Sequence, residues 1–412
     1  MLFQRIKATY NEFPGQFWLM VIGLFISTAG SSMIMPFMMI YASNKLQLPL
    51  STVAALLSIN AGTGLLSSFL AGTLADKAGR KLVMNISLTA NGLVYFFLLQ
   101  ANNYVQFAVL MFLIGMSNPL YQVGADAMLA DLVPSEKRVD AYAINRMINN
   151  AGFALGPAIG GFVASRSYAL AFYAATAGFL IYSALLFFLA RETLVKNKIY
   201  SDKKPVPAEA DGGYREVFQN KHYVGVISLI ATGLIAPSML WVLLAVYTKT
   251  NFGLPENLYG WIPTTNALMC VFVQYSVTRV TRRFPALPVV AIGLLIYSLG
   301  VGSVALMSGF WGFWLSMVIL TFGELTLVPT ATKYVADLAP SNLRGRYMSI
   351  YWFGWGASRA IAPVLGGYIN DQIAPRAIWI AGLIIGATSG LVLLFLSRRQ
   401  TESRSVIETE AA

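Results

Sequence analysis

Charged residues are scarce in this sequence, and so are cysteine and histidine. Asp, Glu, Lys and Arg make up 11% of the 412 residues, whereas soluble domains carry about 25%. The single cysteine, Cys270, excludes a disulfide framework within the chain and a cysteine-based metal site. The single histidine, His222, excludes clusters of histidine ligands. We therefore expect no metal site, no cofactor and no enzymatic activity.

Hydrophobic residues, by contrast, make up 57% of the chain. They form roughly twelve apolar stretches of about 20 residues, each long enough to cross a hydrocarbon core of about 30 Å as a helix. The longest polar segment between them, Arg191 to Lys221, has the length of a linker and leaves no room for an appended catalytic domain. The sequence therefore predicts an all-α membrane protein.

The apolar stretches predict where the transmembrane helices begin. The first runs from Phe17 to Tyr41, too long for the apolar region of a signal peptide. The expected helix starts are Phe17, Leu50, Lys81, Tyr104, Lys137, Tyr168, Tyr223, Asn257, Ala286, Trp311, Arg344 and Arg376. We expect residues 1–190 to form an N-terminal six-helix bundle, 191–221 a cytoplasmic linker, and 222–412 a C-terminal six-helix bundle with a short cytoplasmic tail.

The net charge of +11 follows from membrane orientation rather than from an acidic partner. In this topology nearly all lysines and arginines fall on the side of the termini and the linker. The opposite side carries only Lys45, Arg166, Lys249 and Arg376. By the positive-inside rule both termini are cytoplasmic, so we expect a multi-pass protein of a bacterial-type inner membrane that binds no nucleic acid.

The chain also contains an internal repeat. The run from Ala130 to Gly161 aligns without gaps on the run from Ala336 to Gly367, with identical aspartate, proline, arginine and glycine residues at matching positions. Duplicated halves in the same orientation predict two pseudo-symmetric bundles related by an axis along the membrane normal, with the substrate held between them.

A short turn between the second and third helices carries the motif G-T-L-A-D-K-A-G-R-K, which begins at Gly72. Gly72 and Gly79 permit close approach and a tight reversal, and Asp76 and Arg80 can form charge-assisted bonds to neighbouring helices in one conformation only. We interpret the turn as a gating latch; an ordinary charged loop is the alternative. The motif resembles the signature of the major facilitator superfamily at this loop. The corresponding turn of the second half keeps basic residues but lacks the acid.

The fifth helix carries small residues spaced so that two helix backbones can meet, together with a proline. These residues are Gly152, Gly156, Pro157, Gly160 and Gly161. Small-residue packing alone would explain the spacing. The pattern in this helix also resembles the antiporter motif of the drug:proton antiporter subgroup, and that resemblance implies a seal against leakage. The two resemblances together imply the major facilitator fold with about twelve helices and alternating access.

Ionisable residues inside membrane helices are costly and mark functional sites. We expect proton coupling at Glu324 and Arg359, which helical rise places at one depth, and at Asp126 and Arg146. Glu324 also resembles an acid that several drug:proton antiporters carry in the tenth helix, although their acid in the first helix is missing here. Lys333 is a further embedded base that could instead snorkel. Four residues at equivalent turns form an expected cytoplasmic gate scaffold: Asp131, Arg138, Asp337 and Arg344.

Flexible thioethers and aromatic rings suit varied apolar ligands. The candidate residues for a substrate cavity are Met33, Met38, Trp241, Tyr351 and Trp355, and core or lipid-facing packing is the alternative for each.

The sequence as a whole predicts a monomeric, proton-coupled exporter of lipophilic or amphipathic compounds, with protons as the coupling ion and membrane lipids around it. A lipid or glycolipid flippase and an exporter of one metabolite, such as a sugar, peptide or siderophore, remain alternatives. A channel or a membrane receptor is more remote, because duplicated halves and a two-state latch favour a transport cycle.

Overall fold

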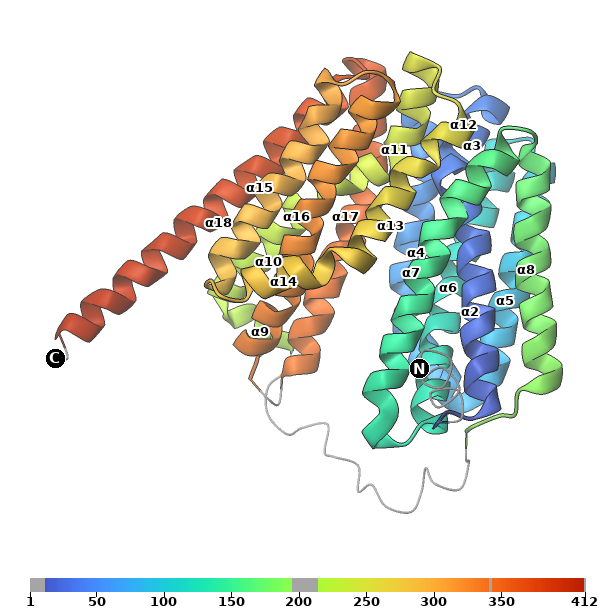
Figure 1. Ribbon diagram of the computed structural model, residues 1–412, viewed down its shortest axis with the longest axis horizontal. Helices are drawn as coiled ribbons and strands as arrows, with labels where there is room; N and C mark the ends of the chain where they lie inside the picture. The colour runs from blue at the N-terminus through green and yellow to red at the C-terminus, as the bar shows by residue number, and fades with distance from the viewer. Residues whose placement is uncertain (1–11, 195–213, 341–342, 411–412) are drawn as a thin grey trace, which may run out of the picture. The chain divides into compact units, whose positions relative to one another are not determined.

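The computed structural model describes residues 12–194, 214–340 and 343–410, and these are helical almost throughout (Figure 1). Within these ranges, helices long and apolar enough to cross a membrane cover Gly15–Leu46, Leu50–Ala78, Arg80–Gln100, Tyr104–Leu132, Tyr168–Leu189, Lys221–Phe252, Ala286–Leu306, Gly309–Leu338 and Ala377–Arg398. The described residues contain no β-strand. The predicted all-α membrane fold is confirmed.

The other three expected spans are helical as well, but they are less apolar or interrupted. They correspond to α7 (Arg138–Ala164), to the sequence α12, α13 and α14 (Glu256–Tyr259, Trp261–Phe272, Gln274–Thr281), and to α17 (Arg344–Gln372). α7 and α17 carry several charged and polar side chains, and the third span breaks into short helices. Each of the twelve expected helix starts lies at the observed start or within two residues of it.

Helix ends in the first half follow local sequence signals. Its elements are α2 (Gly15–Ile34), η1 (Met35–Phe37), α3 (Met38–Leu46), α4 (Leu50–Ala78), α5 (Arg80–Gln100), α6 (Tyr104–Leu132), η2 (Ser135–Lys137), α7, and α8 (Tyr168–Leu189). Pro36 lies in the tight 3-10 turn η1, where a proline ring interrupts regular helix. The Asn103 side chain accepts a hydrogen bond from the backbone N–H of Gln106 and so caps α6.

The second half repeats this organisation. After α9 (Tyr214–Gln219) come α10 (Lys221–Gly233), α11 (Ile235–Phe252), α12 to α14, α15 (Ala286–Ser303), η4 (Val304–Leu306), α16 (Gly309–Leu338), α17 and α18 (Ala377–Glu410). Asn220 caps α10 by accepting a hydrogen bond from the N–H of Tyr223. Close backbone contact joins α15 to α16, because a Cβ on Gly293 would lie 2.9 Å from the backbone nitrogen of Leu327.

The chain divides into two compact units that exchange short segments. Unit 1 comprises Met1–Gln47, Ile59–Lys203 and Pro255–Ala267, and unit 2 comprises Leu48–Ser58, Lys204–Leu254 and Leu268–Ala412. The start of α4 therefore belongs to the unit that contains most of the C-terminal half. The start of the α12 to α14 span belongs to the unit that contains most of the N-terminal half.

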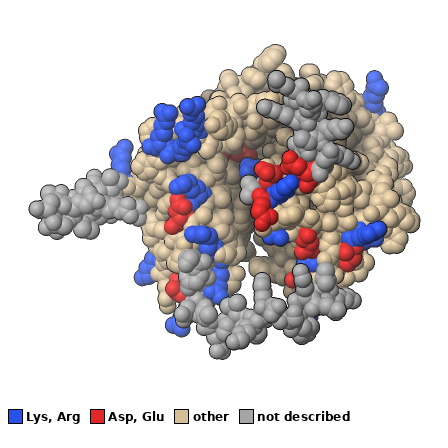
Figure 2. All heavy atoms as spheres, turned by 60° about the horizontal axis from the view of Figure 1, so that its bottom comes forward, with Lys and Arg blue, Asp and Glu red and all other residues tan. Residues whose placement is uncertain are grey.

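Figure 2 turns towards the viewer the face that lies at the bottom of Figure 1. Many Lys and Arg side chains lie on this face among Asp and Glu. Within unit 1, the turns from α4 to α5 and from α6 to α7 lie at one end, which we call the latch end; the end of α3 and the start of α12 lie at the opposite end, the seat end (Figure 1).

Candidate functional site

The signature turn forms an ion pair between two helices of unit 1. Gly79 has φ 108°, a conformation that glycine adopts without strain, and it lets α5 start directly after α4. The Arg80 Nε atom then lies 3.0 Å from Asp131 Oδ2 on α6. Asp76 is 69% exposed, and its carboxylate lies 3.9 Å from the Arg80 guanidinium. The structure thus brings a predicted latch residue together with a predicted scaffold residue.

Glu192 also belongs to this site, although the sequence alone did not identify it as a site residue. Its carboxylate accepts hydrogen bonds from the backbone N–H groups of Arg80 at 3.1 Å and Lys81 at 3.0 Å, the first two residues of α5. A carboxylate at a helix N-terminus is stabilised by the helix dipole. Thr193 donates a second bond, 2.9 Å long, to Asp131. The only signal in the sequence was an acid directly after the sixth expected span.

The equivalent turn in the second half is bonded differently. Asp337, the repeat equivalent of Asp131, pairs with Lys333 one turn earlier on its own helix at 2.6 Å. Both side chains are largely exposed, so this pair contributes little to stability. Arg138 donates from Nε to the Val133 carbonyl at 3.1 Å, and its equivalent, Arg344, is exposed at the start of α17. The identical aspartates of the repeat therefore form different bonds in the two halves.

The glycine face of α7 lies directly on α2. A Cβ on Gly152 would lie 2.9 Å from the Thr28 side chain, and one on Gly156 would overlap Ser32. At Gly160 it would overlap the backbone of Met33. The Ser32 hydroxyl completes the contact by donating to the Gly152 carbonyl at 3.0 Å. The backbone contact that the motif predicts is therefore present, with α2 as the partner.

A second face of α7 packs against the start of the α12 to α14 span within unit 1. A Cβ on Gly161 would overlap the backbone of Glu256, and one on Gly260 would overlap that of Pro157. The Tyr168 hydroxyl donates to Glu256 Oε1 at 2.8 Å. Among the side chains that the structure describes, Glu256 is the only acidic or basic one that is fully buried, at 7% exposed. The sequence did not reveal this burial, because Glu256 stands at the start of a helix.

Unit 2 contains the same arrangement. A Cβ on Gly367, the repeat equivalent of Gly161, would lie 2.6 Å from the Cα of Ser51. The two aligned runs of the internal repeat are separated by a constant offset along the chain. The same offset relates Leu50 to Glu256 and Ser51 to Asn257. We call these two packing sites, Gly161 with α12 and Gly367 with the start of α4, the glycine seats. Each seat holds the first turn of a helix from the other half.

The embedded acid and base of unit 1 lie apart from each other. The Gln122 side chain donates to Asp126 Oδ2 at 3.1 Å, and Tyr142 donates to the Asp126 carbonyl at 3.3 Å. Arg146 lies on α7 and is exposed. Within the described residues, no hydrogen bond or ion pair joins Asp126 to Arg146. Their role in proton coupling stays a prediction.

In unit 2, Glu324 and Arg359 share a neighbour. Both lie within electrostatic range of Tyr297, which is buried on α15 and whose backbone packs directly against Gly323 of α16. Glu324 is half-buried on α16, whereas Arg359 is exposed on α17. An exposed arginine inside a membrane helix needs water or polar groups around it, because lipid hydrocarbon does not solvate it.

The five candidates for a substrate cavity differ in exposure. Met33, Met38 and Tyr351 are buried in helix packing, Trp355 is half-buried, and Trp241 is exposed. Their contact with a substrate stays a prediction.

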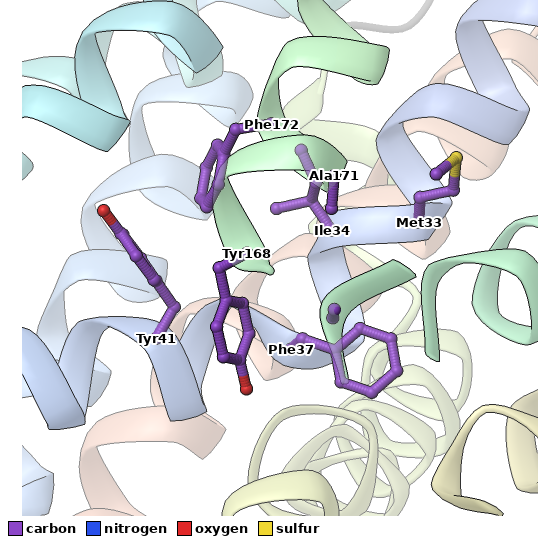
Figure 3. Close-up of a pocket in the computed structure, with 8 residues that line it drawn as sticks. Met33, Ile34, Phe37, Tyr41, Tyr168, Ala171 and Phe172 are labelled. Carbon is purple, nitrogen blue, oxygen red and sulfur yellow. The ribbon is translucent and has the colours of Figure 1, made fainter. Parts of the chain in front are cut away.

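Met33 also borders an apolar hollow of unit 1 at the seat end, where the labelled residues of α2 to α3 and α8 face one another (Figure 3). This hollow is too tight for a water molecule. Its lining residues are Met33, Ile34, Phe37, Tyr41, Ala164, Tyr168, Ala171 and Phe172.

The family model of the Major Facilitator Superfamily matches residues 20–239 and again residues 226–412. The chain belongs to the major facilitator superfamily. Two successive matches along one chain agree with the internal repeat. Together with the helical fold, they establish a multi-pass transporter of the inner membrane with a small-molecule substrate.

Curated relatives of this superfamily transporter match over most of its length. The MFS-type transporter YttB of Bacillus subtilis is 27% identical over 396 residues, covering 94% of this chain and 96% of that protein. The quinolone resistance protein NorA of Staphylococcus aureus is 24% identical over 404 residues, covering 94% and 98%. A Na(+), Li(+), K(+)/H(+) antiporter of Planococcus maritimus is 24% identical over 378 residues, covering 84% and 87%.

Solved structures of transporters share the fold. A bacterial homologue of the human lysosomal transporter Spinster, in an inward-facing and occupied conformation, has a TM-score of 0.78 at 13% identity, covering 93% of this chain and 96% of that one. The peptide transporter POT in complex with sulfate has a TM-score of 0.77 at 16% identity, covering 94% and 95%. The family relatives and these structural neighbours are transporters rather than enzymes.

Proposed function

We propose that this transporter exports lipophilic or amphipathic compounds in exchange for protons, by alternating access. The observation that carries the proposal lies in unit 2: Glu324 on α16 follows Gly323, whose backbone meets that of buried Tyr297 on α15, and Arg359 lies on α17, which packs against α16. An acid in such a low-dielectric setting takes up or releases a proton according to the distance of the nearby positive charge. Glu324 is the proposed proton site and Arg359 its conditional partner.

The names of two relatives support this class. One is a quinolone resistance protein and another is a cation/proton antiporter, so drug resistance and exchange against protons both occur among proteins of similar sequence. The latch supports a two-state cycle, because Arg80 bonds Asp131 through an ion pair that helix movement can break. We further propose that the latch end of unit 1 faces the cytoplasm and that both termini are cytoplasmic, since the loops on that side of the predicted topology carry most of the basic residues.

Purified protein in proteoliposomes with an imposed pH gradient tests this function. Ethidium and other amphipathic dyes should move uphill when the gradient is present and stop when an ionophore collapses it. Labelled lipids, sugars, peptides and sodium in parallel vesicles distinguish a flippase, a metabolite exporter and a cation antiporter. Passive equilibration that ignores the gradient would show a channel and would contradict the proposal.

A further inference from the structure

A strip of polar side chains runs along α6 and α7 in unit 1, and we call it the polar strip. On each helix its members stand three or four positions apart and therefore share one face. Each of them is exposed or half-buried, and charged side chains at such positions in membrane helices face water or a ligand path rather than lipid. The members are Gln122 and Asp126 on α6, and Tyr142, Arg146 and Asn149 on α7.

Two hydrogen bonds fix the strip in place. The Tyr142 hydroxyl donates to the backbone carbonyl of Asp126 at 3.3 Å and so joins α7 to α6. The Thr28 hydroxyl of α2 donates to Asn149 Oδ1 at 2.9 Å and so joins α7 to α2. Because these bonds connect three helices of one unit, the charged members of the strip keep their positions relative to one another.

The carboxylate of Asp126 can still accept hydrogen bonds. Gln122 donates to its Oδ2 atom at 3.1 Å, and no other hydrogen bond and no ion pair reaches this carboxylate within the described ranges. An ionised carboxylate has about four acceptor sites, so most of them remain available. The side chain is half-buried, and there its attraction for a cation is stronger than in bulk water.

The Arg146 guanidinium is available in the same way. Among the residues that the structure describes, none forms a hydrogen bond or an ion pair with this side chain. Its planar fork of N–H groups matches a carboxylate. Arg146 stands one helical turn beyond Tyr142, about 6 Å further along the axis of α7. The strip therefore presents an acid and a base that are offset along it and are not paired with each other.

We propose that the polar strip binds substrates that carry both a positive and a negative group, with Asp126 holding the cationic group and Arg146 the anionic one. This inference rests on the proposed function, because it names the class of compound that the exporter carries: zwitterionic amphipaths whose charges lie about one helical turn apart. The ring of Tyr142, which is 39% exposed, supplies a contact for the apolar part. The proposed proton site lies in unit 2, so substrate and proton bind to different acids.

Binding of rhodamine B and of its ethyl ester to the purified protein tests the inference without any pH gradient. Rhodamine B is a zwitterion at neutral pH, and the ester is a cation with the same ring system. The unaltered protein should bind rhodamine B about tenfold more tightly, since only its carboxylate can pair with Arg146. In Arg146→Gln this preference should disappear. Asp126→Asn should weaken the binding of both dyes about tenfold, because both are cations at the other end.

Arg166→Gln and Asp140→Asn are the matched controls, because both side chains are exposed in unit 1 and lie outside the strip. These variants should bind both dyes as the unaltered protein does. Arg146→Lys keeps a positive charge and should retain part of the preference, which separates recognition of charge from a general disturbance of α7.

Three results would overturn the inference: equal affinity of the unaltered protein for the two dyes, an Arg146→Gln variant that keeps the preference, and unchanged binding in Asp126→Asn. The first comparison uses no variant, so it holds even where a substitution prevents folding. Failure of the proposed function is separate, since it appears as transport that ignores the pH gradient.

Discussion

Asp371 caps the helix that begins at Leu50: one carboxylate oxygen accepts the backbone N–H of Ser51 at 2.8 Å, and the other accepts that of Leu50 at 3.2 Å. The capped turn belongs to the N-terminal half, whereas Asp371 ends α17 of the C-terminal half. Both lie in unit 2 beside the glycine seat at Gly367. A carboxylate therefore holds an exchanged segment at the end of α4 opposite the signature turn.

Weakening this cap should loosen the exchanged segment. Asp371→Asn leaves one weaker acceptor in place of two charged ones, and loss of a cap costs about 1 kcal/mol, roughly a fivefold change in an opening equilibrium. A cysteine in place of buried Ala54, on a Cys270→Ser background, should react several-fold faster with an impermeant maleimide. Asn370→Ala, which removes a neighbour of Asp371 but no bond to α4, is the control. Equal rates in both variants would contradict the role of the cap.

The signature acid should matter more for transport than for stability. Asp76 is mostly exposed and its carboxylate lies 3.9 Å from Arg80, so Asp76→Asn should leave expression and folding intact. If Asp76 stabilises the outward-open conformation, the variant should transport less and open more at the latch end. Accessibility labelling from the cytoplasmic side measures this. Normal transport with unchanged labelling would indicate that the motif is an ordinary charged loop that only sets the membrane topology.

Glu192 should determine how firmly the latch turn is held. Glu192→Gln replaces a charged acceptor at the start of α5 by a neutral one, and we expect increased proteolytic cleavage near Arg191 together with reduced transport. Glu136→Gln, an exposed acid between α6 and α7 in the same unit, is the control. If both variants behave alike, the cap has no specific role.

Enlarging Gly156 should disrupt the α2 to α7 contact. Gly156→Val forces a side chain into Ser32 and should cost about 1–3 kcal/mol of overpacking, with loss of transport or a proton leak. An added Cβ on Gly62 of α4 meets no atom within 4 Å, so Gly62→Val serves as the control. Proton leakage from proteoliposomes without substrate separates a broken seal from simple inactivation. Wild-type behaviour of Gly156→Val would leave small-residue packing as the only role of the motif.

Removing the charge of Glu324 should uncouple transport. Glu324→Gln cannot exchange a proton, so gradient-driven uphill movement of dye should be lost while dye binding persists and no longer varies with pH. Dye binding to purified protein and uptake into proteoliposomes measure the two steps. Full gradient-driven transport by this variant would move the proton site to Asp126.

Much of the fold could be read from the sequence, because lipid imposes a simple rule: backbone groups must bond within helices, so apolar length alone locates the spans. The signature turn was equally local, since Gly79 and Arg80 are neighbours in the chain. The sequence limited the possible partners of Arg80 to charged residues on the same side of the membrane. Helix packing decides that the partner of Arg80 is Asp131. It also decides that Asp337 pairs with Lys333 instead of forming the equivalent bond.

The sequence by itself determined the helices, the repeat, the latch turn and the glycine face, since each follows from local composition or spacing. Only the tertiary structure decided which distant residues meet. Glu192 reaches α5, Asp371 caps α4, the backbones of Tyr297 and Gly323 meet, and Glu256 is buried although it begins a helix. These contacts arise where helices that are remote in sequence pack together, and helical periodicity fixes which face a residue occupies but not which helix it meets.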